Sequence, residues 1–180
     1  MHAARRLFLE HGVGPTTIEQ ITSGADVAKG TFYLYFSSKE DVLAALRERF
    51  AQELLVSLKA AIAERPKEDW KGKLAAWAAT GVTVYLESIR LHDILFYGSH
   101  PPTREGLVDN IVIDHLAGLL QDGVDAGAWS IDDPRFTAVF MFSGLHGVYD
   151  AFAKEKRVNR SRLAHRLERL CFRAVGLPLG

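Results

Sequence analysis

The residues with the clearest chemistry in this chain stand between Lys29 and Lys39. Lys29, Gly30 and Thr31 supply a positive charge, a position without bulk and a hydroxyl group in succession. At the start of a helix, beside its free amides, such residues suit close approach to phosphates and base edges. Lys39 opens a later helix and projects beside the same surface. The stretch therefore predicts a nucleic-acid interface.

Two very short helices joined by a tight turn must position these residues. Pro15 stops the preceding chain, Thr17 can cap the next helix, and Gln20 completes a capping box. The segment 24–26 breaks that helix, because Asp26 tolerates turn and left-handed conformations. Helices of about two turns are not stable alone, since helix nucleation is costly. The pair predicts a helix-turn-helix that offers its second helix to a DNA groove.

The order and spacing of residues in roughly the first fifty positions resemble the TetR family of transcriptional regulators. The matching motifs are Ala3-Ala4, Leu7-Phe8, Thr16-Thr17-Ile18, Gly30-Thr31-Phe32-Tyr33, Tyr35-Phe36 and Ser38-Lys39-Glu40. The resemblance and the composition of the helix start together indicate these DNA-facing residues: Thr17, Lys29, Gly30, Thr31, Tyr33, Tyr35 and Lys39. The resemblance implies that Tyr33, Tyr35 and Lys39 contact phosphates. Core positions are expected for Val27, Phe32 and Phe36.

Charge adds nothing to this DNA-binding signal. The chain has 22 Lys and Arg against 22 Asp and Glu, and residues 1–50 carry six of each kind. Nucleic-acid binders usually show a basic surface. Residues 1–4 align with the middle of the family's first helix, so a truncated first helix without the family's basic arm is expected. The charge balance indicates modest non-specific affinity for DNA.

Beyond Lys39 the hydrophobic spacing predicts only helices, so the expected fold class is all-α. A helix-turn-helix DNA-binding domain at 1–48 would precede a helical ligand-binding and dimerisation domain at 49–180. Long helices are expected over these ranges: 38–65, Trp70 to near His92, Arg104–Asp125, Pro134 to near Lys154, and Ser161 to near Gly176. No signal peptide and no apolar run of about eighteen residues is visible, which predicts a cytoplasmic protein that does not enter the membrane.

The last two helices are the expected surface of a homodimer. One stripe comprises Phe136, Phe140, Gly144, Gly147 and Ala151, and the matching stripe comprises Leu163, Leu167, Leu170 and Ala174. A helix-turn-helix generally needs two half-sites to gain affinity, which favours a dimer. The alternative is that both stripes belong to an ordinary intramolecular core.

A small-molecule effector site is expected in the second domain, where aromatic bulk mixes with scattered polar groups. The candidate ligand residues are Trp77, Tyr85, Ser88, His92, Phe96, His115, Phe142 and His146. The alternative is that they are core, since aromatic residues at helical spacing usually pack inside.

Three functions stay open at this stage. The first is a regulator, in particular a repressor, that a small molecule releases from palindromic operator DNA. The second is a dimeric DNA-binding protein without an effector. The third is an all-helical metal-dependent hydrolase, prompted by His92-Asp93 and Asp114-His115. The hydrolase would need another His shortly upstream, and the nearest is His11, so no catalytic residue, metal or cofactor is expected.

Overall fold

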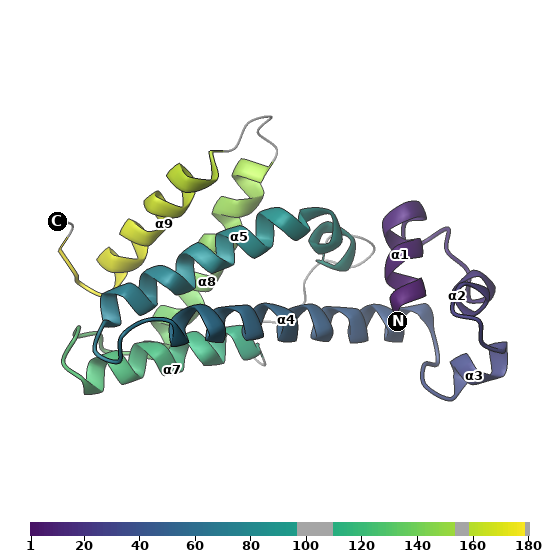
Figure 1. The fold of residues 1–180 in the computed structure, drawn as a ribbon, viewed down its shortest axis with the longest axis horizontal. Helices are drawn as coiled ribbons and strands as arrows, with labels where there is room; N and C mark the ends of the chain where they lie inside the picture. The colour runs from purple at the N-terminus through teal and green to yellow at the C-terminus, as the bar shows by residue number, and fades with distance from the viewer. Residues whose placement is uncertain (97–109, 154–158, 179–180) are drawn as a thin grey trace. The chain divides into compact units, whose positions relative to one another are not determined.

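The computed structural model describes residues 1–96, 110–153 and 159–178 of the chain. Within these ranges it contains helices and no strand, which confirms the all-α prediction. Figure 1 shows them in chain order: α1 (His2–His11), α2 (Ile18–Gly24), α3 (Lys29–Tyr33), α4 (Lys39–Ala63), α5 (Trp70–Phe96), α7 (Ile111–Asp125), α8 (Pro134–Ala153) and α9 (Arg160–Ala174). None of the helices in the described ranges is long and apolar enough to span a membrane.

A side-chain cap starts α2, and a left-handed residue separates α2 from α3. Thr17 and Gln20 form the predicted capping box of α2. The Gln20 N–H donates to Thr17 Oγ1 over 3.1 Å, and the Thr17 N–H donates to Gln20 Oε1 over 2.8 Å. Asp26 has a φ of 54°, the left-handed conformation expected between α2 and α3. α3 begins at Lys29, as the sequence predicts.

The longest helix continues further than the sequence suggests. α5 runs to Phe96 rather than ending near His92, and it is kinked at Ser88, where φ is −115° and ψ is 15°. The chain between Ser88 and Phe96 contains no Gly, Pro or Asn, so nothing in the local sequence ends the helix at His92.

Side-chain caps start the later helices. Asn110 Oδ1 accepts two amide hydrogens at the start of α7; the start expected at Arg104 lies outside the described residues. Asp133 accepts one amide hydrogen at the start of α8, which begins at Pro134 as predicted. Asn159 caps α9, so this helix begins one residue before the expected Ser161.

The chain folds as two compact units. The first comprises residues 1–51 and 88–103, and the second comprises residues 52–87 and 104–180. α4 and α5 each contribute residues to both units. In α5 the second unit ends and the first begins at the kink at Ser88. The first unit therefore includes the end of α5, which the sequence analysis assigned to the second domain.

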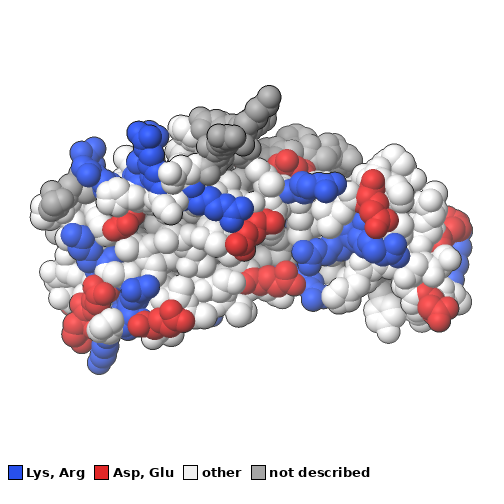
Figure 2. Space-filling model, turned by 45° about the horizontal axis from the view of Figure 1, so that its top comes forward, with Lys and Arg blue, Asp and Glu red and all other residues white. Residues whose placement is uncertain are grey.

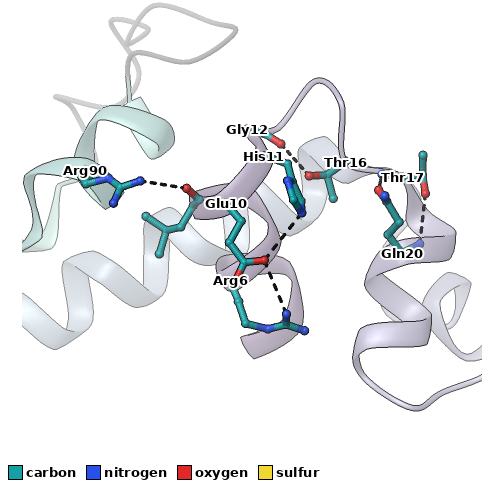
Figure 3. Close-up of polar contacts among 9 residues, drawn as sticks. Arg6, Glu10, His11, Gly12, Thr16, Thr17, Gln20 and Arg90 are labelled. Carbon is teal, nitrogen blue, oxygen red and sulfur yellow. Dashed lines mark hydrogen bonds and ion pairs between the residues drawn. The ribbon is translucent and has the colours of Figure 1, made fainter.

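The first unit has one apolar core, to which α1–α4 and the end of α5 contribute. Its buried members are Ala4, Leu7, Phe8, Ile21, Phe32, Val42, Leu43, Leu46, Leu91 and Leu95. Leu91 and Leu95 belong to α5, so the last turns of that helix hold the N-terminal helices in place. Arg90 adds a hydrogen bond from its Nη2 to the Leu9 carbonyl over 3.3 Å (Figure 3).

In the second unit, α7 packs against α8, and α8 packs against α9. Leu163 and Leu167 of α9 are 5% and 1% exposed, so they face the core of their own chain. This corrects the predicted dimer stripe on the last helix, because helical spacing identifies an apolar face and not what covers it. Leu170 of the same stripe is 52% exposed, and Phe136 and Phe140 of α8 are 72% and 66% exposed.

Candidate nucleic-acid interface

Four large side chains lie on the surface around α3. The exposed fractions are 42% for Val27, 51% for Tyr33, 79% for Leu34 and 76% for Tyr35. Val27 was expected inside; instead its backbone N–H joins the turn, donating to the Thr22 carbonyl over 3.0 Å, and its side chain stays outside. Large apolar groups gathered on a surface mark an interaction site.

Phe32 holds this surface against the core. It is 6% exposed, and its ring lies 5.4 Å from that of Tyr33 and 5.7 Å from that of Phe36. The expectation that Phe32 is a core residue is confirmed, and Phe36 is partly buried. With Phe32 fixed inside, its neighbour Tyr33 faces outward on the same short helix.

Gly30 is free of any packing constraint within the protein. Apart from its two chain neighbours and the backbone of its own helix, a Cβ at this position would meet no atom within 4 Å, and the residue does not have a left-handed φ. Glycine nevertheless weakens a helix by about 0.5–1 kcal/mol relative to alanine. The lack of a side chain therefore serves no need of the fold, and it leaves the backbone open to close approach from outside.

The first residue of α3 is engaged in an ion pair. Lys29 Nζ donates to Glu19 Oε1, although both side chains are about half exposed or more. This hydrogen bond and the attraction between the charges hold the pKa of Glu19 below, and that of Lys29 above, their usual values. Glu19 thus neutralises the charge nearest the start of α3.

The second lysine of the interface is bound to backbone. Lys39 Nζ donates to the carbonyls of Val13 and Gly14 over 2.9 Å each, and to that of Thr16 over 2.7 Å. Thr16 is completely buried, and its hydroxyl donates to the Gly12 carbonyl over 2.7 Å (Figure 3). The segment that precedes Thr17 is therefore held from two sides.

Charged groups are mixed over the surface. On the face drawn in Figure 2, blue and red side chains alternate, and no large basic field appears there. This agrees with the even charge count of residues 1–50. A nucleic-acid contact on this face would depend on individual groups, because the face offers no broad basic surface.

The predicted ligand residues divide between the two units. The second unit contains Trp77, Tyr85, His115, Phe142 and His146, and the first contains Ser88, His92 and Phe96. His92 is 3% exposed and its ring lies 6.1 Å from Phe50 and 4.7 Å from Phe96, so these rings belong to the packing of the first unit. The eight residues form no single cluster within either unit.

Part of the set does gather where α5 and α8 pack. The ring of Tyr85 lies 4.8 Å from Tyr149 and 6.0 Å from His146, and the Tyr85 hydroxyl donates to Asp150. Burial lowers the pKa of His146, opposed by its bond to the Phe142 carbonyl and by Asp150. Burial raises the pKa of the Tyr149 phenol. His146 and Tyr149 are therefore neutral near pH 7, and the cluster carries a single acidic group.

Sequence reasoning missed two residues of the interface. Leu34 is the most exposed large apolar residue among those described, and it stands between the two tyrosines that the sequence analysis selected. Phe32 and Phe36, one helical turn apart on the core side, signalled that Leu34 faces away. Glu19 gave no signal, because its pairing with Lys29 depends on how the turn folds.

Residues 1–46 match the family model of the bacterial regulatory proteins of the tetR family. The HTH-type transcriptional regulator EthR of Mycobacterium tuberculosis is 29% identical over 89 residues, which are 49% of this chain and 39% of EthR. The fatty acid metabolism regulator protein of Bacillus subtilis is 37% identical over 75 residues, covering 41% of this chain and 34% of that protein. The chain is thus matched to less than half the length of these relatives.

A solved structure is similar over almost the whole chain. The fatty acid degradation regulator FadR from Bacillus halodurans superposes with a TM-score of 0.75 at 25% identity, covering 98% of this chain and 97% of that one. These similar proteins are transcription regulators and not enzymes, which removes the hydrolase alternative. The N-terminal helices of this chain therefore match the TetR family model, and its complete fold is similar to that of a solved bacterial regulator.

Proposed function

We propose that this chain is a DNA-binding repressor whose dimer recognises a palindromic operator. α3 would enter the major groove, with these residues at the DNA: Thr17, Lys29, Gly30, Thr31, Tyr33 and Tyr35. Leu34 would add an apolar contact to thymine methyl groups. The observation that carries the proposal is Gly30, a glycine whose missing side chain the fold does not require.

Replacing Gly30 with alanine separates a DNA contact from a folding role. Alanine favours helix by up to about 1 kcal/mol, so Gly30→Ala should be as stable as the wild type or slightly more so. Its methyl group would nevertheless obstruct the closest approach of α3 to DNA, and affinity for the operator should fall about tenfold or more. Gly118→Ala, in an equally open helical position of α7, is the matched control. Unchanged operator binding by Gly30→Ala would remove α3 from the interface.

The homodimer is proposed to form through α8, with a contribution from the exposed part of α9. The residues on the open face of α8 are Phe136, Phe140, Gly144, Gly147 and Ala151. Exposed phenylalanines beside glycines combine large apolar area with room for a second helix to approach. Two-fold symmetry would then present two copies of α3 to the two half-sites of a palindrome.

An apolar effector with a hydrogen-bond acceptor is proposed to bind the second unit. In the described residues, the buried Trp77 Nε1 and His115 Nδ1 have no hydrogen-bond partner. Burial and the charge of Lys59 lower the pKa of His115, which keeps its ring neutral near pH 7. Buried polar atoms are normally paired, and an acceptor on a ligand would pair these. Since two similar proteins are named for fatty acid metabolism and degradation, fatty acids are the first ligands to test.

The effector proposal can fail without affecting the DNA-binding proposal. Thermal shift with saturated fatty acids of increasing length, and with alkanes of equal length as controls, should show stabilisation by the acids only. Trp77→Phe keeps most of the ring and removes the donor, so it should lose the preference for acids, whereas alanine at this buried site would open a cavity. If no acid stabilises the protein or releases operator DNA, the effector class is wrong and a regulator without an effector is favoured.

A further inference from the structure

The ammonium of Lys39 is fully occupied inside the protein. An ammonium has three N–H donors, and Lys39 Nζ lies within 2.9 Å of three carbonyl oxygens, those of Val13, Gly14 and Thr16. The side chain is only partly exposed. In this arrangement no donor is left for a DNA phosphate.

The three carbonyls belong to the segment that joins α1 to α2. The segment ends in Thr16, which is completely buried, and is followed directly by Thr17, the cap of α2. Lys39 is the first residue of α4. One side chain therefore ties the start of α4 to the backbone that sets where α2 begins, and α3 follows α2 after a turn of four residues.

The position of Lys39 in the first turn of α4 also indicates that its ammonium needs a binding partner. A cation in the first turn of a helix is disfavoured by the helix dipole, so the sequence gains nothing from a lysine there unless it binds something. Three carbonyl oxygens supply the negative partial charges that offset this. To bind a phosphate instead, Lys39 would leave all three carbonyls, including that of buried Thr16, without this donor.

We infer that Lys39 is a positioning residue, which orients α2 and α3 by fastening the α1–α2 segment and does not itself contact DNA. The inference rests on the proposed DNA-binding function and changes the role that the family resemblance implies for this lysine. Lys39 then affects operator affinity through the orientation of α2 and α3. It makes no phosphate contact of its own.

The slope of log K against log salt distinguishes the two roles, because each phosphate contact contributes about 0.9 to it. For Lys39→Met, which keeps the stem and removes the donors, we expect a Tm lower by about 5 °C. Amide exchange at Gln20 and Ile21, whose N–H groups bond to Thr17, should become roughly tenfold faster. Operator affinity should fall, with an unchanged salt slope.

Three further variants complete the experiment. Lys39→Arg keeps the charge, but a planar guanidinium cannot direct three donors to the same carbonyls, so it should behave like Lys39→Met. Lys29→Gln should give a shallower slope with an unchanged Tm, and the change should be less than one full unit per protomer because Glu19 competes for Lys29. Lys67→Gln removes an exposed charge from the second unit and should change neither quantity.

A phosphate role for Lys39 would give the opposite pattern. Lys39→Met would then have an unchanged Tm and a shallower salt slope, and Lys39→Arg would bind like the wild type; either result overturns the inference. A Tm fall together with a shallower slope also overturns it, because Lys39 would then contact DNA. The Tm and exchange measurements need no DNA, so they test the fastening role even if the proposed function is wrong.

Discussion

Gly147→Leu is the substitution that best separates the dimer from the fold of one chain. Gly147 lies on the open face of α8, and a Cβ there would meet no atom within 4 Å apart from its chain neighbours and the backbone of its own helix. Leucine also favours helix over glycine by up to about 1 kcal/mol. The isolated chain should therefore fold as well as the wild type or better.

The cost in the dimer follows from two-fold symmetry. Overpacking a close helix crossing typically costs about 1–3 kcal/mol, and a symmetric interface contains the substitution twice. The free energy of dimerisation should then weaken by about 2–6 kcal/mol, which raises the dimer Kd between roughly 30-fold and roughly 20,000-fold.

Sedimentation velocity over a range of protein concentrations measures this change directly. Gly118→Leu, the same substitution at an open position on α7, is the control and should dimerise like the wild type. DNA binding should fall in parallel with the dimer fraction. If Gly147→Leu stays dimeric at the concentrations where the wild type does, the partner does not cross α8 at this glycine and the proposed interface is wrong.

Three further outcomes follow from individual contacts. Glu19→Gln removes the competitor for Lys29, so fluorescence anisotropy should show tighter DNA binding with a steeper salt slope; equal binding would mean that Lys29 does not reach phosphate. Gly123→Ala places a methyl group against the Trp129 ring and should lower the free energy of unfolding by about 1–3 kcal/mol in urea titrations, and a fully stable variant would contradict this packing. Burial raises the pKa of Cys171 to about 12, so at pH 8 an aromatic disulfide reagent should label the folded protein about a thousandfold more slowly than the unfolded chain; equal rates would place the thiol at the surface.

The helix starts near the N-terminus could be predicted because their causes are local. The capping box of Thr17 and Gln20, the left-handed Asp26 and the start of α3 at Lys29 all depend on residues within a few positions of each other. The same holds for Asp133 at α8. Interactions between residues a few positions apart can be predicted from a sequence without knowing the fold.

The predictions that differ from the structure concern helix faces that are covered by residues distant in the sequence. Leu163 and Leu167 have the spacing of an interface stripe, yet their own chain covers them. His92 was expected in the second domain, yet it packs with rings of the first unit, and its ligand role stays a prediction. Hydrophobic periodicity shows that residues share a face, and only the tertiary arrangement decides what covers that face.

The role of Lys39 illustrates the same limit within the interface itself. Its position at the start of α4 indicated a group beside the DNA-facing surface. Its three carbonyl partners lie 23 to 26 residues earlier in the chain, and no spacing rule connects them. A side chain that the sequence suggested for an external contact is therefore bound within its own chain, and its part in DNA binding stays a prediction.

The central claim is that this chain reads DNA as a symmetric dimer through α3, and selection from a random duplex library tests it most directly. We expect the protein to enrich inverted repeats whose half-site centres are separated by about one helical turn or a multiple of it, with an affinity that falls steeply with salt. Gly30→Ala should enrich them poorly. A library that stays random, or enriched sites without two-fold symmetry, would contradict the claim.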